Sequence, residues 1–409
     1  MSERGAREAG GTAGVGAPSA AVPFLAARGV CKRFGACQAL EQIDLDVAND
    51  ELLVVLGPTG AGKTTLLRTI AGLERPDAGR IVVGGRDLTG LSPAARDVAL
   101  VFQNFSLYPR WTVRKNLEFP LRAPGRNLPD AEIRRRIEWA AELLSITRYL
   151  EREASRLSGG EMQRVAIGRA IVRRPSLFLM DEPLTNLDAK LREALRVELV
   201  QLRRQLGTPM IFVTHDQTEA LSMADRIVVL SEGRILQMGT PREIYERPVS
   251  PVVALQLGQP AINLMRVRRQ AGHWLGSDGT PLIAADGAGP ADRVLGIRPE
   301  HIALDPDPGS TAAEGVVRIV EYIGPTTTLL VDWAGDRVHI VVPRRAALRP
   351  GDHVRPRIDA TRAVLFSPEK HDGQPEAAHG GSLARASLHR GDPDCSAHRA
   401  SYHPTEEMP

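Results

Sequence analysis

A glycine-rich loop at residues 57–64 constrains this chain of 409 residues more than any other segment. It reads Gly-Pro-Thr-Gly-Ala-Gly-Lys-Thr and fits the phosphate-binding pattern G-x-x-x-x-G-K-[ST]. Its glycines permit a backbone in which successive N–H groups converge on phosphate oxygens. An apolar, strand-like run at residues 52–56 precedes the loop and a helical pattern follows it. The loop therefore predicts an α/β domain that binds phosphate groups.

We expect a nucleotide's phosphates to lie in this loop. In such loops the lysine, here Lys63, reaches the β- and γ-phosphates, and the hydroxyl of the next residue, Thr64, binds Mg²⁺. The residues expected to surround the nucleotide at this point are Gly57, Pro58, Thr59, Gly60, Ala61, Gly62, Lys63, Thr64 and Thr65.

Two adjacent carboxylates follow a second apolar run. Residues 177–180, Leu-Phe-Leu-Met, predict a buried strand, and Asp181 and Glu182 stand at its carboxyl end, where an open α/β sheet collects its ligands. Phosphoryl transfer requires neutralised charge and an attacking water held in line. We therefore expect Asp181 to hold Mg²⁺, directly or through water, and Glu182 to orient and polarise the attacking water.

Three further residues have no clear role when they are considered alone. His215 follows a predicted strand at residues 211–213, and a histidine in such a place is more often structural than catalytic. The amide of Gln103 can meet Mg²⁺ or water, but nothing in its own surroundings points there. The ring of Phe34 can stack on a base, yet an isolated aromatic residue is more often part of a core.

The pattern of apolar runs indicates two domains. Strand-like runs alternate with helical patterns from residue 24 onward, which predicts a mostly parallel sheet covered on both faces. We expect a helical subdomain at about 105–160, including a helix from Asp130 to Leu150, and an all-β domain at 246–366, where β-branched runs replace helical patterns. Residues 1–23 and the His/Ser/Pro-rich residues 367–409 have little to bury, so we expect both to be disordered.

Composition narrows the classes of function and location. The formal net charge is only +3 and basic residues are scattered, so nucleic acid is not an expected partner. No window approaches the roughly 18 uninterrupted apolar residues of a membrane-spanning helix. The three cysteines form no CxxC pair, which favours a reducing compartment such as the cytoplasm.

Residues 157–163 read Leu-Ser-Gly-Gly-Glu-Met-Gln and stand just ahead of the run that ends in the two carboxylates. With the phosphate loop, this segment resembles the signature of the ATP-binding cassette family, and the resemblance covers residues 24–245. It implies a RecA-like P-loop domain with a helical subdomain, with ATP and Mg²⁺ as cofactors. It also implies an ATPase that energises membrane transport.

The resemblance assigns roles to residues that the patterns alone leave open. Two subunits of such proteins close head to tail, so that Ser158, Gly159 and Gly160 of one cap the ATP on the other. The same resemblance implies that His215 contacts the γ-phosphate, that Gln103 meets Mg²⁺ or water, and that Lys63 and Glu182 complete the catalytic set. It further implies that Phe34 stacks on adenine and that Asp188 approaches the opposite subunit.

The segment at residues 101–121 is similar to the family's receiving site for a membrane subunit. Its apolar residues, Phe105, Leu107, Tyr108 and Trp111, are either a docking groove or the core of the helical subdomain. The resemblance implies two permease partners, a second ATPase subunit and, indirectly, a solute-binding protein. These partners place the chain at the cytoplasmic face of the inner membrane as a peripheral subunit.

The second domain narrows the resemblance to importer ATPases. Residues 258–264 and 295–301 match the OB-like accessory β-barrel, called TOBE, of maltose, glycerol-phosphate and spermidine importers. We expect uptake of a carbohydrate, with polyamine and ferric-iron import as alternatives. A soluble, non-transport cassette ATPase is a competing class, but such proteins carry two cassettes or a long coiled coil. A vestigial ATPase would lack one of the catalytic residues, and this chain has all of them.

Overall fold

The computed structural model describes residues 22–285, 290–305, 313–343 and 348–367. The two segments predicted to be disordered, 1–23 and 367–409, lie outside the described residues apart from the innermost residues of each.

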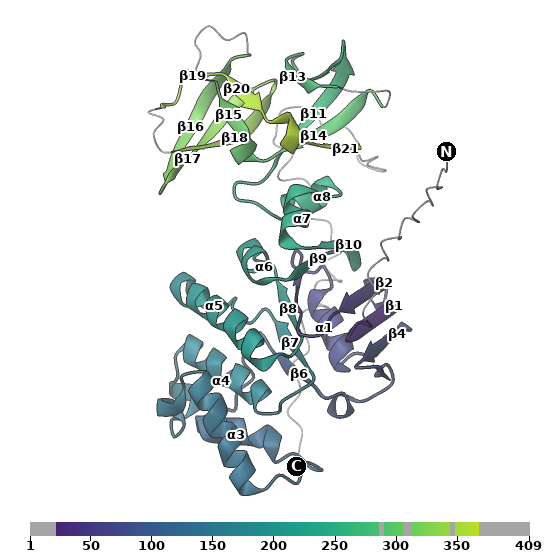
Figure 1. Cartoon of the computed structure of the whole chain (residues 1–409), viewed down its shortest axis with the longest axis vertical. Coiled ribbons are helices and arrows are strands. Elements are labelled where there is room, and N and C mark those ends of the chain that lie inside the picture. The colour runs from purple at the N-terminus through teal and green to yellow at the C-terminus, as the bar shows by residue number, and fades with distance from the viewer. Residues whose placement is uncertain (1–21, 286–289, 306–312, 344–347, 368–409) are drawn as a thin grey trace, which may run out of the picture.

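The centre of the first domain is a six-stranded sheet (Figure 1). Four of its five strand pairings are parallel, and β10 joins the edge antiparallel to β9. The strands in spatial order are β10 (Arg234–Gly239), β9 (Arg226–Ser231), β3 (Leu52–Leu56), β8 (Met210–Thr214), β7 (Leu177–Asp181) and β6 (Val98–Val101). The predicted parallel sheet is confirmed, because the apolar runs pair in register as its inner strands.

Both faces of this sheet are buried, which explains why its strands read as unbroken apolar runs. In β3, Leu53 and Val55 face one hydrophobic core, whereas Leu52, Val54 and Leu56 face another. The first core lies against α1 (Lys63–Ala71) and a second, antiparallel sheet that the sequence did not reveal. That sheet has the order β2 (Cys37–Val47), β1 (Leu25–Phe34), β4 (Ala78–Val83) and β5 (Arg86–Asp87).

Helices cover the other face of the six-stranded sheet. They are α2 (Val113–Glu118), α3 (Asp130–Leu143), α4 (Gly159–Ile171), α5 (Ala189–Leu206) and α6 (Gln217–Met223). The helix expected from Asp130 begins there but ends at Leu143, not at Leu150. Ser145 adopts a left-handed backbone with φ of 56°, which stops the helix, and Thr147–Tyr149 forms a separate 3₁₀ turn. Further 3₁₀ turns are η1 (Pro93–Ala95), η2 (Phe119–Leu121) and η4 (Ala154–Arg156).

The second domain is all-β, as expected, and is built from three small sheets. One sheet has the order β13 (Pro281–Ala284), β12 (His273–Leu275), β11 (Asn263–Gln270), β14 (Asp292–Ile297) and β21 (Val364–Phe366). The others are β15 (Ile302–Leu304) with β20 (Pro356–Ile358), and β18 (Asp336–Pro343), β17 (Thr326–Trp333), β16 (Gly315–Ile323) and β19 (His353–Val354). Two short turns, η5 (Pro299–His301) and η6 (Ala360–Arg362), complete the domain, whose sheets share one hydrophobic core.

Two short helices, α7 (Pro241–Glu246) and α8 (Pro251–Leu255), lie between the sheet of the first domain and the β domain (Figure 1). The buried Arg298 joins these parts: its guanidinium donates to the carbonyl oxygens of Ala254, Leu257 and Tyr245 and lies 4.0 Å from the Tyr245 ring centroid. The Tyr245 hydroxyl in turn donates to Glu300 at 2.6 Å. Arg298 therefore helps to join the β domain to α7 and α8.

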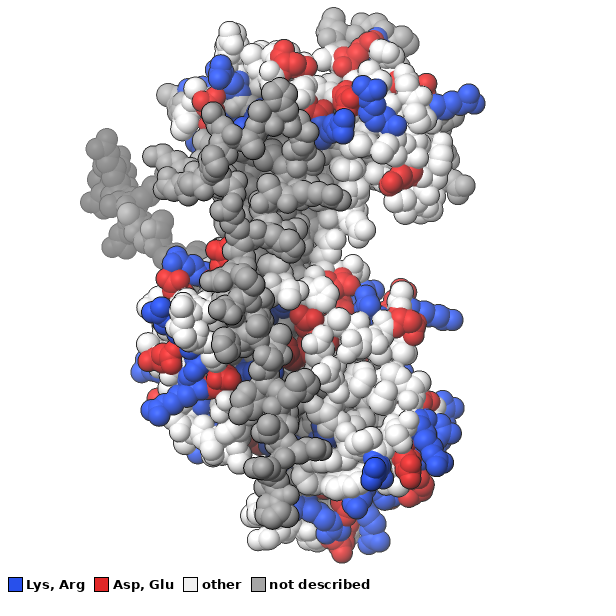
Figure 2. All heavy atoms as spheres, turned by 180° about the vertical axis from the view of Figure 1, so that it is seen from behind, with Lys and Arg blue, Asp and Glu red and all other residues white. Residues whose placement is uncertain are grey.

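The surface is of mixed charge on the face seen in Figure 2, where acidic and basic side chains are interspersed over both domains. Within the described parts of the chain, no helix is both long and apolar enough to cross a membrane.

Candidate functional site

The glycine-rich loop connects the buried end of β3 to the first residue of α1, Lys63. Gly62 stands before that helix with a φ of 104°, a conformation that other L-residues rarely adopt. The position is also crowded, because a Cβ atom on Gly62 would lie 2.5 Å from the carbonyl oxygen of Ala39. Only glycine fits there, so the loop can bring its backbone N–H groups and the N-terminus of α1 together, where they favour an anion.

Lys63 is the charged centre of the site. Its ammonium donates to the carbonyl oxygens of Gly57 and Pro58, each at 3.0 Å, and lies 3.3 Å from Oε1 of Glu182. The side chain is only 4% exposed. Burial lowers the pKa of the Lys63 ammonium, although the nearby Glu182 carboxylate opposes this effect. The loop thus holds a poorly solvated cation in reach of a carboxylate.

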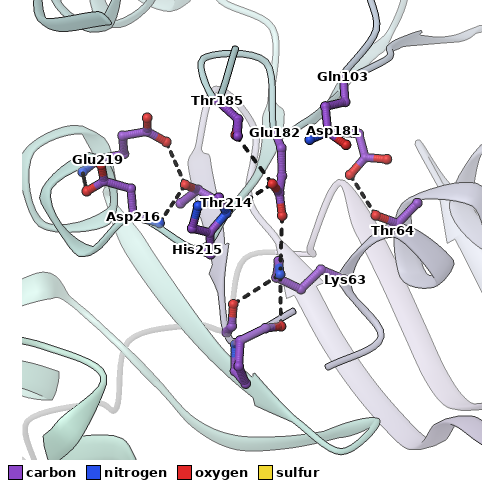
Figure 3. A network of polar contacts seen from close by, with 12 residues as sticks. Lys63, Thr64, Gln103, Asp181, Glu182, Thr185, Thr214, His215, Asp216 and Glu219 are labelled. Carbon is purple, nitrogen blue, oxygen red and sulfur yellow. Dashed lines mark hydrogen bonds and ion pairs between the residues drawn. The ribbon is translucent and has the colours of Figure 1, made fainter. Parts of the chain in front are cut away.

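Glu182 links this cation to a histidine (Figure 3). Its Oε2 atom lies 3.0 Å from Nδ1 of His215 and accepts a hydrogen bond from the Thr185 hydroxyl at 3.3 Å. Glu182 has a φ of 45°, in the left-handed region that is costly for a residue with a side chain. Its backbone N–H donates to the carbonyl of Val213 in β8 at 3.1 Å, which holds this conformation next to the sheet. The contacts therefore fix the carboxylate between Lys63 and His215.

Asp181 lies on the other side of the site. Its Oδ1 atom accepts a hydrogen bond of 2.9 Å from the Thr64 hydroxyl, and Figure 3 shows the Gln103 side chain on the same side. Burial raises the pKa of the Asp181 carboxyl, with a smaller contribution from the neighbouring Glu182. The side chains of Asp181, Thr64 and Gln103 all carry oxygen atoms, and those of Asp181 and Thr64 lie within hydrogen-bonding distance of each other. Oxygen atoms are the ligands that Mg²⁺ prefers.

Three other predicted residues lie away from this network. Ser158 is the N-cap of α4 and forms a capping box with Glu161, so the signature segment begins this helix. Asp188 is the N-cap of α5, where its carboxylate accepts from the N–H of Leu191 at 3.0 Å. Phe34 is half-buried at the end of β1, with the Lys32 ammonium 5.0 Å from its ring centroid.

Several residues that the sequence reasoning did not single out support the site. The Asn186 amide donates to the carbonyl oxygen of Gln103 at 3.2 Å, and the Thr214 hydroxyl donates to the buried Glu219 at 2.6 Å. The Thr185 hydroxyl is a direct hydrogen-bond partner of Glu182. No local pattern marks these residues, because each acts through a neighbour that lies far from it in the chain or across a turn.

A phosphate-binding loop at the carboxyl end of a parallel sheet, with paired carboxylates beside its lysine, defines a P-loop nucleotide-binding protein. Comparison with known families narrows this class. The family described as ABC transporter matches residues 40–185, and the TOBE domain matches residues 295–366.

Relatives match most of the chain. The sn-glycerol-3-phosphate import ATP-binding protein UgpC 3 of Agrobacterium fabrum is 45% identical over 336 residues, which span 81% of this chain and 94% of that protein. The UgpC protein of Rhizobium meliloti is 48% identical over 293 residues, or 71% of this chain and 82% of the relative. The UgpC protein of Cupriavidus necator is 42% identical over 361 residues, which span 84% of this chain and 97% of that protein.

Solved structures match the first domain. CbiO1 of Clostridium perfringens, part of the ABC transporter complex CbiONQ, shares 27% identity at a TM-score of 0.51 and covers 55% of this chain and 91% of its own. A nucleotide-free ATP-binding cassette from an ABC transporter shares 25% identity at a TM-score of 0.51, and the match covers 57% of this chain and 98% of that cassette. This chain belongs to the ATP-binding proteins of ABC transporters. It is the ATP-binding and hydrolysing subunit of an importer, an ATPase coupled to transmembrane transport.

Proposed function

We propose that two copies of this chain hydrolyse ATP at shared sites and thereby drive uptake of a small polyol or sugar derivative through two permease subunits. The observation that supports the site most directly is the position of Glu182 between Lys63 and His215. The carboxylate is held at the mouth of the phosphate loop, where it can orient a water molecule. Lys63, Gln103, Glu182 and His215 then form the catalytic set.

Lys63 and Glu182 change partners in this proposal. Without nucleotide the Lys63 ammonium pairs with Glu182 and with carbonyl oxygens of its own loop. The β- and γ-phosphates of ATP carry more negative charge than one carboxylate and compete for the ammonium. Once Lys63 turns to the phosphates, Oε1 of Glu182 is free to accept a proton from water, while His215 and Thr185 still fix Oε2. Binding of ATP thus completes the site for hydrolysis.

Magnesium fits the oxygens on the opposite side of the site. Thr64, Asp181 and Gln103 would hold Mg²⁺, in part through water, and the ion would neutralise charge on the β- and γ-phosphates. Burial makes Asp181 costly to ionise, and a cation beside it removes that cost. The site thus has a physical reason to bind the metal and the nucleotide together.

The second copy supplies the other wall of each site. Ser158 is exposed, and within the described residues its hydrogen bonds run only to Glu161 and Met162 of its own helix, so the N-terminus of α4 is open to a partner. Backbone N–H groups at the start of this helix favour a phosphate anion. We propose that Ser158, Gly159 and Gly160 cap ATP on the other copy, that Asp188 approaches that copy, and that Phe34 stacks on adenine.

An aromatic cluster formed by Tyr108, Trp111 and Phe119 is the proposed docking site for a permease. The Tyr108 and Trp111 rings stack with centroids 4.2 Å apart, and Phe119 meets both edge-on. Tyr108 is 38% and Phe119 49% exposed, whereas Phe105 and Leu107 pack against the hydrophobic core. Of the residues expected in the groove, Phe105 and Leu107 therefore contribute to the core. The aromatic cluster offers apolar surface to a partner.

The curated relatives take their names from import of sn-glycerol-3-phosphate. We propose the same class of solute here, a phosphorylated or plain polyol delivered by a solute-binding protein, with the chain on the cytoplasmic face of the inner membrane. The earlier alternatives, polyamine and ferric iron, become outcomes of the test.

The test is uptake by cells whose own gene for this chain is deleted. Cells that carry the wild-type gene on a plasmid should take up radiolabelled sn-glycerol-3-phosphate, and cells that carry the Glu182→Gln gene should not. Equal uptake by both would contradict the proposed solute. Loss of spermidine or ferric-iron uptake in the deletion strain would assign the transporter to that solute instead. Recovery of two permeases with the tagged chain from solubilised membranes tests the proposed partners independently.

A further inference from the structure

The segment at residues 103–112, which carries part of the aromatic cluster, has an unusual backbone. Phe105 and Ser106 are consecutive non-glycine residues with left-handed φ values of 59° and 50°. Such conformations are costly and persist only where the surroundings hold them. This segment therefore depends on contacts from other elements.

Side chains from α4 and α2 supply those contacts. Arg169 of α4 donates to the carbonyl oxygens of Ser106 at 2.6 Å and Phe105 at 3.2 Å. The fully buried Asn116 of α2 accepts from the N–H of Tyr108 at 2.9 Å and donates to its carbonyl oxygen at 3.1 Å. Asn116 thus holds the aromatic end of the segment, and Arg169 holds the left-handed pair.

The Arg169 contact connects two regions that the sequence places far apart. Ser158 is the N-cap of α4, and Arg169 lies in the last turn of the helix. The helix between them spans roughly 16 Å at 1.5 Å per residue. The side chain is partly buried, and burial lowers the pKa of its guanidinium, which is satisfied here by neutral carbonyl oxygens. Nothing in the phosphate loop or the carboxylate pair requires this arginine.

We propose that Arg169 is a positioning residue that links residues 103–112, which carry part of the proposed docking site, to α4, the helix that begins in the signature sequence. A permease that shifts the aromatic cluster would pull on Phe105 and Ser106, and through the planar, two-pronged Arg169 contact would move α4 and Ser158 with it. The permease would thereby control whether Ser158 closes on the ATP of the other copy. This inference rests on the proposed function and adds a residue to it.

Hydrogen exchange of the purified chain gives the first readout. In Arg169→Ala, amide exchange at residues 104–108 should accelerate about tenfold, because the left-handed pair loses its anchor. The matched control is Arg164→Ala, on the same helix, whose guanidinium instead bonds the carbonyl of Leu144 and pairs with Glu198. That variant should leave the exchange of 104–108 unchanged. Equal exchange in wild type and Arg169→Ala would overturn the anchoring role.

Coupling is measured in the complete transporter, purified with its permeases from native membranes and placed in liposomes. The ratio of ATPase kcat in the complex to kcat of the free chain should fall about tenfold in Arg169→Ala, with KM for ATP within about twofold of wild type. Arg169→Lys keeps the charge without the two-pronged geometry, so its ratio of kcat values should lie between those of wild type and Arg169→Ala. Arg164→Ala should keep the wild-type ratio.

The two proposals fail in different ways. If wild-type chain brings no permease out of the membrane, the proposed function is wrong and the inference falls with it. If permeases are recovered and Arg169→Ala keeps the full ratio of kcat values, the inference alone is wrong.

Discussion

The Glu182 carboxylate contacts His215 through one oxygen and Lys63 through the other: Oε2 lies 3.0 Å from Nδ1 of His215, and Oε1 lies 3.3 Å from the Lys63 ammonium. One side chain thus spans the gap between the phosphate loop and the end of β8. Its left-handed backbone and the hydrogen bond from Thr185 fix it in this place. This relationship yields the first prediction.

Glu182→Gln should keep ATP binding and lower kcat by about 10²–10³, because the amide keeps the shape of the side chain but cannot take a proton from water. ATPase turnover and equilibrium binding of a fluorescent ATP analogue measure the two effects separately. The control is Thr185→Val, which removes only one of the contacts of Glu182 and should change kcat by no more than about fivefold. Turnover of Glu182→Gln near the wild-type rate would exclude Glu182 as the catalytic carboxylate.

Glu219 predicts a dependence of stability on pH. This side chain is 3% exposed, and burial raises the pKa of its carboxyl in the folded protein. The folded state therefore binds the proton more tightly than the unfolded state, whose pKa is about 4.3. The contribution of Glu219 to stability is fully present below that value and is lost as pH rises through the folded pKa.

Glu219→Gln should accordingly raise the melting temperature at pH 8, because the amide stays neutral and its oxygen still accepts from Thr214. The gain should shrink as pH falls and vanish below about pH 4. Thermal unfolding from pH 4 to 8 measures the difference. A variant that is less stable than wild type at pH 8 would show that the ionised carboxylate is favourable where it lies.

Removal of the Arg298 side chain should lower stability where the two domains meet. In Arg298→Ala the carbonyl oxygens of Ala254, Leu257 and Tyr245 lose their donor, at a cost of about 2–4 kcal/mol in the free energy of unfolding. Limited proteolysis should then cut first between α8 and β11. The control is Tyr245→Phe, which removes only the hydroxyl bond to the exposed Glu300 and should cost less than about 1 kcal/mol. Similar protease resistance in wild type and Arg298→Ala would show that the domains do not depend on this contact.

The sequence predicted those parts of the fold that carry strong local patterns. β3 and β7 are apolar runs buried on both faces, so their strands and the residues after them, including Asp181 and Glu182, followed from the pattern alone. The antiparallel sheet of β1, β2, β4 and β5 was not predicted, because its strands mix buried and exposed residues and are interrupted by bulges. The length of α3 was overestimated because nothing in the residues after Leu143 signals the left-handed turn at Ser145.

The candidate site, like the fold, could be predicted from the sequence only in part. Lys63 and Thr64 were assigned by a pattern whose chemistry is local, whereas His215, Gln103 and Asp188 were assigned only through the family resemblance. The contacts of Asn186, Glu219 and Arg169 depend on tertiary structure and lay beyond any local pattern. The roles of Ser158 and Asp188 across two copies stay predictions, since both residues form only local caps in the single chain.

The most direct test of the shared ATP site compares Glu182→Gln with the double variant Glu182→Gln/Ser158→Arg. Each is incubated with ATP and Mg²⁺, and the molar mass and the ATP retained after gel filtration are measured. The account predicts a dimer that retains about one ATP per chain for the single variant. The double variant should still bind ATP at equilibrium but retain none after filtration. Retention of ATP by the double variant at the level of the single variant would contradict the claim that Ser158 closes the site of the other copy.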